Sequence, residues 1–487
     1  MKTSLLSTPG LGKKQLQWFY VLIAAFGLLA AATYVKGIPY TLLLPVALIF
    51  IMIAVFHLEW LVFFAVLVTP LSINLAETSI GIGVSLPAEP LMFALFLVFW
   101  LKVFAEGGLD HRIATHPVTI AIFLYLAWMT LTTFTSTLFL VSLKSTLARY
   151  CYISVFYFML LHVFRNIKNI YRFLWLYIST LVLVVLYTLY THYLGGFTEK
   201  VAHIAMVPFY NDHTAYAAAI AFFIPPLFAL LADRYREKKN TTFVALITAL
   251  LITAIVLSYT RASWVGMVGA LTVWFLFVFR IRKALILGGF VGLVLIAFLF
   301  RTQITLRLEN TTKTSSTNLA DHVESISNIK SDASNVERLN RWACAIRMFK
   351  DKPLFGFGPG TYMFQYGPYQ KFSEKSVIST NFGIGGGSHS EYLGPLAEQG
   401  ALGPLLFIAI AIAVTLSASR VIRRSNDPRI RGLAKGLLIG LVTYWIQGVL
   451  NYFLDTEKSA VPYWGFIAAI VALDLYHSRK ERNAVVK

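Results

Sequence analysis

The sequence has little charge and almost no cysteine. Only 13% of its 487 residues are charged and 57% are hydrophobic, whereas a soluble domain carries roughly 25% charged residues. Its two cysteines, Cys151 and Cys344, offer neither a disulfide framework nor the spacing of a metal site. The glycine-rich stretch at residues 352–362 lacks the GK[ST] of a nucleotide-binding loop. These absences argue against a soluble enzyme and against a P-loop protein.

Long apolar runs recur along the whole chain, and each is close to the roughly 20 residues that a membrane crossing needs. We predict an all-α polytopic membrane protein with about 14 transmembrane helices (12–14). The predicted spans are Trp18–Val35, Pro39–Phe56, Trp60–Leu75, Pro87–Phe104, Pro117–Thr135, Tyr150–Phe164, Phe173–Leu194, Thr214–Ala232, Thr241–Tyr259, Ala262–Phe279, Ala284–Phe300, Leu402–Ser419, Leu437–Leu454 and Val461–Tyr476.

The basic residues predict how these spans are oriented. The formal net charge is +19, and the lysines and arginines gather in short clusters between apolar runs. With the N-terminus inside, the cytoplasmic segments hold 25 basic residues and the short outside loops hold six. This bias is typical of loops retained in the cytoplasm, so we expect both termini there. The first apolar run is followed at once by others, which favours an anchor over a cleaved leader.

One long outside segment, residues 301–400, divides the chain. It separates eleven spans in residues 1–300 from three spans and a cytoplasmic tail in residues 401–487. Within it, Val336–Lys350 has apolar residues at helical spacing and is typical of an amphipathic surface helix. A glycine run then leads to His389, which stands between Ser388 and Ser390 just before a predicted helix. A helix N-terminus lowers the pKa of a nearby histidine and favours its neutral form.

Several motifs together resemble one membrane-protein family. They are FYNDHTAYAAAIAFFIPP (209–226), LSYTRASWVG (257–266), RLNRW (338–342), PLFGFGPGTY (353–362), SHSEYL (388–393) and LAEQGALG (396–403). In this order and at these membrane positions they are similar to the O-antigen ligase and O-antigen polymerase family. Known ligases of the family have about twelve spans, so fourteen would be a departure.

The resemblance implies transfer of a glycan from a polyprenyl-diphosphate donor to an acceptor hydroxyl on the periplasmic face of a bacterial inner membrane. It implies no cofactor and no metal, with a lipid-anchored acceptor such as lipid A-core. His389 would be the general base, and Arg338 and Arg261 would hold the diphosphate. We expect substrate contacts from seven further residues, namely Arg341, Tyr259, Trp342, Asn211, His213, Ser388 and Glu391.

The chemistry of these residue types agrees with those roles. A guanidinium binds phosphate oxygens through two parallel hydrogen bonds and stabilises the charge of a leaving diphosphate. A neutral imidazole can accept the proton of the acceptor hydroxyl, and attack opposite the diphosphate would invert the anomeric carbon. Each residue also has a simpler interpretation. Arg261 can extend to lipid headgroups, Arg338 and Arg341 can face solvent, and His203, Asp212 and His213 match no strong metal-ligand pattern.

Three alternative functions stay open at the level of sequence. A repeat-unit polymerase of the same family would share the chemistry, although such proteins tend to have two large outside loops, and the second here, Gly195–His213, is short. A lipid-linked oligosaccharide flippase or solute transporter would place polar residues in the middle of the membrane. A scaffold for envelope assembly would use the long loop to bind partners.

Overall fold

The computed structural model describes residues 57–74, 84–278, 333–375, 379–380 and 386–478, together with Tyr20, Val21, Ala24, Gly27 and Ala31. The predicted spans Pro39–Phe56 and Ala284–Phe300 lie outside the described residues, as does nearly all of Trp18–Val35. The described chain is helical apart from loops and one short antiparallel pair, β1 (Ile73–Asn74) with β2 (Ser85–Leu86), in which Ile73 faces Leu86.

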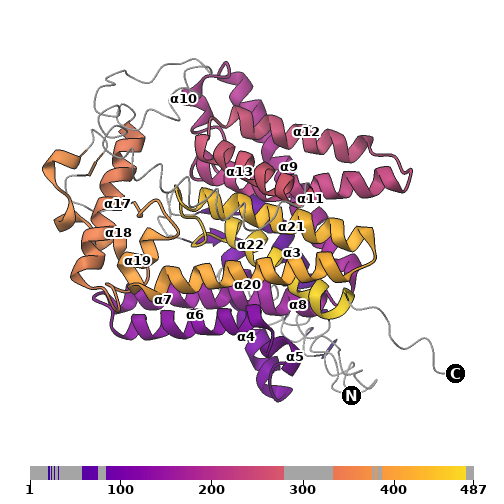
Figure 1. Cartoon of the computed structure of the whole chain (residues 1–487), viewed down its shortest axis with the longest axis horizontal. Coiled ribbons are helices and arrows are strands. Elements are labelled where there is room, and N and C mark those ends of the chain that lie inside the picture. The colour runs from indigo at the N-terminus through magenta and orange to yellow at the C-terminus, as the bar shows by residue number, and fades with distance from the viewer. Residues whose placement is uncertain are drawn as a thin grey trace.

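Most of the long helices run roughly along the horizontal axis of Figure 1, whereas the helix at residues 333–351 runs across it. Up to the long segment they are α3 (Leu58–Val68), α4 (Ala88–Ala105), α5 (His111–Ala114), α6 (Pro117–Phe134), α7 (Phe139–Ile153), α8 (Leu160–Val163), α9 (Ile167–Leu194), α10 (Glu199–Ala202), α11 (His213–Arg236), α12 (Thr242–Leu257) and α13 (Arg261–Val278). After it come α17 (Ala333–Asp351), α18 (Tyr362–Gln365), α19 (Leu393–Gln399), α20 (Leu402–Arg424), α21 (Pro428–Gln447) and α22 (Glu457–Ala472).

Seven of the described helices are long and apolar enough to cross a membrane, and three shorter apolar helices accompany them. This is the composition of a polytopic α-helical membrane protein. The total of fourteen spans and the orientation of the termini stay predictions.

α22 lies at the centre of the bundle, since each of its residues from Glu457 to Ala472 is buried. α11 packs along α21, where small residues permit close approach. A Cβ added at Gly440 would lie 2.5 Å from the carbonyl oxygen of Phe222, and one added at Gly436 would lie 3.0 Å from Cβ of Ala229. α11 remains helical through Pro225 and Pro226.

Two predicted spans are wrong in their bounds, and both errors matter for the site. The span predicted at Tyr150–Phe164 belongs to a longer helix, α7, which begins at Phe139 and continues through a π-helical segment, Ser154–Met159, into α8. Lys144 and Arg149 therefore lie on a helix and not in a short outside loop. Polar residues such as Ser142, Thr146 and Arg149 are buried on one face of α7. They interrupt the apolar run, so the sequence pattern did not indicate that the helix begins at Phe139.

The span predicted at Leu437–Leu454 is also displaced. α21 begins at Pro428, with Asp427 as its N-cap, and ends at Gln447, so residues 448–456 form a loop that precedes α22. The backbone amides of Phe453 and Leu454 donate to the Glu391 carboxylate and not to carbonyls of a helix. A distant acidic side chain thus satisfies backbone groups that the apolar pattern assigned to a span.

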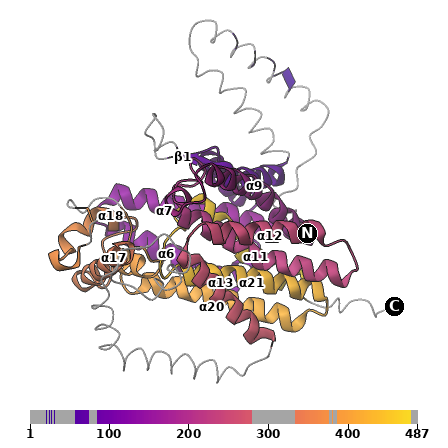
Figure 2. The ribbon, with the colours of Figure 1, turned by 90° about the horizontal axis from the view of Figure 1, so that it is seen from above.

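The segment that carries α17, α18 and α19 lies beyond one end of the bundle (Figures 1 and 2). It has a small buried core of its own, formed by Cys344, Ala345, Met348, Phe357, Tyr362, Tyr366 and Ala397. The turn between α6 and α7 holds this segment in place, because the amide of Thr137 donates to the carbonyl of Phe357 at 3.0 Å. Gly358, at φ +111°, permits this contact, since a Cβ there would lie 2.1 Å from Oγ of Ser136.

Candidate functional site

His389 lies in a tightly held loop between α17 and α19. Ser388 and Ser390 on either side of it are buried, and Nε1 of Trp342 donates to the carbonyl of His389 at 3.4 Å. His389 itself has a positive φ of 52°, a conformation that non-glycine residues adopt only when their surroundings impose it. Gly387 is equally constrained, because a Cβ there would lie 1.9 Å from the ring of Tyr452.

The surroundings of His389 favour its neutral form. Burial has the largest effect on the pKa of the imidazole and lowers it. The positive charges of Arg338 and Arg341 lower this pKa further. The negative charges of Glu337 and Asp212 raise it, but the net pKa still falls to about 4. The predicted direction is therefore confirmed, but burial and two arginines are the main causes. At neutral pH the ring can accept a proton.

Arg338 and Arg341, the two arginines of α17 in the RLNRW motif, differ in their contacts. Arg341 is buried, and its guanidinium donates to Glu337 at 2.6 Å and to the carbonyl of Gly386 at 2.8 Å. It also lies 4.1 Å from the ring centre of Tyr366. These contacts commit Arg341 to the protein, so they favour a structural role over the substrate contact predicted for it. Arg338, one helical turn earlier, is only half buried and acts electrostatically on both His389 and His213.

The start of α11 and the start of α13 meet beside this group. Asp212 caps α11 by accepting hydrogen bonds from the amides of Thr214 and Ala215 at 2.7 and 2.8 Å. The ring of His213 stacks on that of His203, with centroids 4.0 Å apart. Oγ1 of Thr260 donates to the carbonyl of His213 at 3.2 Å, which places Arg261, the next residue and the first of α13, at the same end of the bundle. Tyr259 has a φ of 52° and donates from its hydroxyl to Phe197.

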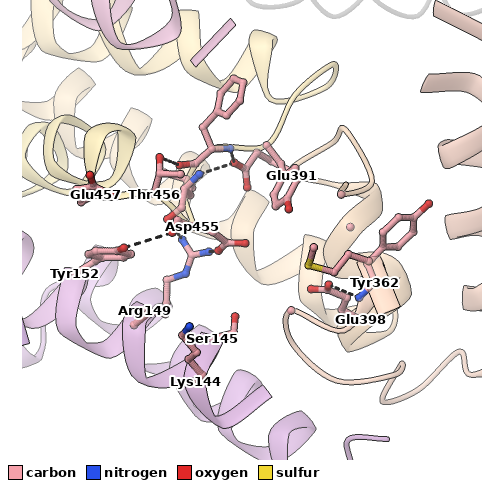
Figure 3. A pocket seen from close by; sticks show the side chains of 18 of the residues that line it. Lys144, Ser145, Arg149, Tyr152, Tyr362, Glu391, Glu398, Asp455, Thr456 and Glu457 are labelled. Carbon is pink, nitrogen blue, oxygen red and sulfur yellow. Dashed lines mark hydrogen bonds and ion pairs between the residues drawn. The ribbon is translucent and has the colours of Figure 1, made fainter. Parts of the chain in front are cut away.

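A cavity of about 850 Å³ opens next to these residues, a size suited to a small-molecule site. It lies between α4, α7, the α19 segment and the loop before α22, and the close-up in Figure 3 shows part of its wall. Of the predicted substrate-contact residues, Asn211, Ser388 and Glu391 line it, and so does Asp212. His389, Arg338 and Arg261 are not among its lining residues, although Ser388 brings the cavity to the immediate neighbour of His389.

Glu391 does more in the fold than the substrate contact predicted for it. Its Oε1 accepts from the amides of Phe453 at 2.7 Å and Leu454 at 3.0 Å and from the hydroxyl of Tyr444. Its own amide donates to Gly448 at 2.7 Å. Glu391 thus joins the His389 loop to the loop before α22, and burial raises the pKa of its carboxyl.

Sequence reasoning missed several charged groups on the cavity wall. Arg149 is buried and pairs at 2.5 Å with Asp455 (Figure 3). An arginine inside an apolar run is the signal that would have found it, because such residues are costly and usually functional.

Glu398 was also missed. It accepts from the amide of Tyr362 at 2.9 Å and from that of Gly360, so it supports the glycine-rich turn at residues 356–360. Burial raises the pKa of its carboxyl to about 8, although these two hydrogen bonds oppose the rise. Only the folded chain brings Glu398 onto the same cavity as Arg149.

The arrangement of possible metal ligands is the last feature of the site. Among the residues that the structure describes, no group of three or more His, Cys, Asp or Glu is placed to hold a metal ion. His203, Asp212 and His213 lie together but do not form such a group.

The fold and this site define a helical membrane protein with a polar site at one end of its bundle. Comparison with known families adds that residues 246–408, about a third of the chain, match the family described as O-antigen ligase. The match runs from α12 to α20 and includes Arg261, Arg338 and His389. No curated protein matches the chain. This similarity supports activity of the O-antigen ligase or polymerase type in general.

Proposed function

We propose that this protein is a glycosyltransferase of the bacterial inner membrane that moves a glycan from a polyprenyl-diphosphate donor to a hydroxyl of lipid A-core or a similar acceptor on the periplasmic face. The observation that carries the proposal is the grouping of His389 with Arg338, beside the starts of α11 and α13 and next to a large cavity.

His389 acts as the general base in this proposal. Its neutral imidazole accepts the proton of the acceptor hydroxyl as the oxygen attacks the anomeric carbon, a contribution of roughly 10²–10⁴-fold. A pKa of about 4 makes a weak base, but a bound diphosphate would place negative charge beside Arg338. That charge offsets the arginine and raises the pKa of His389 toward neutrality, so donor binding itself activates the base.

Arg338 and Arg261 stabilise the leaving diphosphate. Negative charge grows on the phosphate oxygens as the glycosidic bond breaks, and guanidinium groups in a site that excludes water stabilise it strongly. Because the acceptor oxygen attacks the face opposite the diphosphate, the anomeric carbon inverts and no glycan is attached to the enzyme.

The test is reconstitution of the full chain in lipid with a polyprenyl-diphosphate oligosaccharide and lipid A-core. We expect glycan on lipid A-core, inverted at the new linkage and dependent on His389. Long glycan that remains on polyprenol in the absence of lipid A-core would identify a repeat-unit polymerase instead. Donor movement across the bilayer without any new linkage would identify a flippase, and retention at the linkage would contradict direct attack.

A further inference from the structure

The part of the cavity formed by α4, α7 and the start of α22 has a composition that the proposed chemistry does not use. Glu89, near the start of α4, and Glu457, at the start of α22, both line it, as does Tyr152 of α7. Both carboxyl groups lie beside Ser85. In Figure 3, Tyr152 and Glu457 lie on one side of the pocket, while Glu391 and Glu398 lie on the other.

Glu457 has an open hydrogen-bonding position. Only 2% of the residue is exposed, and within the part of the chain that the structure describes its Oε1 has no hydrogen-bond partner. The neighbouring Lys458 has its ammonium group committed elsewhere, because Nζ donates to the carbonyls of Ser72 at 2.7 Å, Pro70 at 3.3 Å and Phe209. A buried carboxylate oxygen without a donor is unfavourable and is satisfied when a ligand supplies one.

The chemistry of the missing partner follows from these groups. Carboxylates only accept hydrogen bonds when ionised, so the ligand must donate, and two carboxyl groups close together disfavour an anion. The described residues include no three-ligand group that would make this a metal site. A sugar ring fits, because its hydroxyls donate while its C–H face can pack on the buried ring of Tyr152, whose own hydroxyl bonds to the Asp455 carbonyl at 3.3 Å.

We propose that Glu89, Glu457 and Tyr152 form a subsite for a sugar of the acceptor glycan, which selects neutral or amino sugars over acidic ones. The inference rests on the proposed glycosyl transfer. The donor diphosphate belongs near Arg338 and Arg261, at the side of the cavity marked by Asn211 and Asp212. The subsite adjoins this side, because Nζ of Lys458 lies 4.5 Å from the ring centre of Tyr210. The acceptor sugar is therefore held by Glu89 and Glu457 beside the donor, with its attacking hydroxyl pointing toward His389.

Binding of simple sugars tests the subsite without requiring transfer. Saturation-transfer NMR on the full chain in lipid nanodiscs would compare methyl glucoside, glucosamine and glucuronate as neutral, cationic and anionic probes. We expect the first two to bind at least 5-fold more tightly than glucuronate. Glu457→Gln should weaken methyl glucoside about 5- to 10-fold, since a hydrogen bond to a charged group becomes one to a neutral amide, and should reduce the discrimination against glucuronate.

The matched control is Glu106→Gln, at the opposite end of α4, which should change none of the affinities. If Glu457→Gln lowers the thermal unfolding midpoint, Glu89→Gln provides the same test. Absence of saturable binding, equal affinity for glucuronate, or unchanged affinities in both variants would overturn the subsite. His389→Ala should reduce transfer by about 10²–10⁴-fold and leave sugar binding intact. Sugar binding that depends on Glu457 in a protein without transfer activity would overturn the proposed function and leave the subsite standing.

Discussion

The two ends of the helix bundle differ in the environment of their charged side chains. At the end where α5, α8 and the loop after α11 lie, carboxylates pair with arginines. Two of these pairs lie near the surface, Arg165–Asp110 at 3.1 Å and Arg429–Glu237 at 2.5 Å, and Arg420–Asp474 at 2.7 Å is more deeply buried. At the other end, His389 and Glu398 are partly buried beside a cavity, and their pKa values move to about 4 and about 8. Paired surface charges have little effect on stability, whereas buried titratable groups in a cleft mark a functional site.

The same contrast appears in the carboxyl groups themselves. Burial raises the pKa of Asp110, but the Arg112 amide and the charges of Arg112 and Arg165 outweigh it, and the net pKa is lowered. Glu398 receives two backbone amides and is also influenced by the charge of Arg149, but burial outweighs all three and its net pKa is raised. The difference lies in how strongly each carboxyl is desolvated and how close its arginines are, and both are properties of the packing.

The largest expected effect separates the two ends by function. His389→Ala should reduce glycan transfer by about 10²–10⁴-fold, because it removes the proton acceptor. The measurement is the rate of transfer by the reconstituted chain, with the thermal unfolding midpoint as the check on folding. His111→Ala, an exposed histidine of α5, is the matched control and should keep full activity. Transfer within tenfold of the unaltered protein in His389→Ala would contradict the assignment.

Arg338 offers a test that combines rate and pH. Arg338→Gln should reduce transfer by about 10²–10³-fold, as for other groups that stabilise developing charge. Because the charge of Arg338 lowers the pKa of His389, its loss should raise that pKa, and the acidic limb of the kcat/KM profile should move to higher pH.

Arg338→Lys is the matched control, since it keeps the charge and loses the planar fork. It should therefore lower the rate without moving the acidic limb. An unmoved limb in Arg338→Gln would show that the arginine does not act on the base.

The third prediction concerns the free energy of unfolding and a residue at the end of the bundle that carries His389. Glu391→Ala should destabilise the protein by about 3 kcal/mol, because the buried amides of Phe453 and Leu454 and the hydroxyl of Tyr444 lose their acceptor. Thermal unfolding in detergent measures it. Glu374→Ala, which breaks a partly exposed pair with Arg347, is the comparison and should have a much smaller effect. Equal effects would mean that burial does not distinguish the two carboxylates.

The smallest effect is expected at the opposite end. Asp110→Asn should cost less than about 1 kcal/mol and leave transfer unchanged, because the pair with Arg165 is partly exposed. A carboxyl whose pKa is lowered by folding stabilises the protein above its unfolded pKa and loses that effect as the pH falls through the folded value. The difference between the two proteins should therefore be present at pH 7 and vanish well below pH 4. A loss of transfer activity in Asp110→Asn would contradict the assignment of function to the His389 end of the bundle alone.

Apolar periodicity was sufficient for several helices and failed where polar groups are buried. Pro117–Thr135 and Leu402–Ser419 were predicted close to α6 and α20. α7 and α21 were misplaced, because Arg149 is paired with Asp455 in space and because Glu391 satisfies the backbone of residues 453–454. Both partners lie far away in the sequence, so no local pattern contains them.

For the site, the sequence by itself determined which residue types were available: a histidine between serines before a helix, arginines at the starts of α13 and α17, and motifs typical of one family. The tertiary structure decided their states. It committed Arg341 to Glu337 and Gly386, left Arg338 beside His389, and placed Glu457 and Glu398 on one cavity. The physical reason is that pKa, pairing and access depend on burial and on neighbours within a few ångströms, and these neighbours come from segments that only folding brings together.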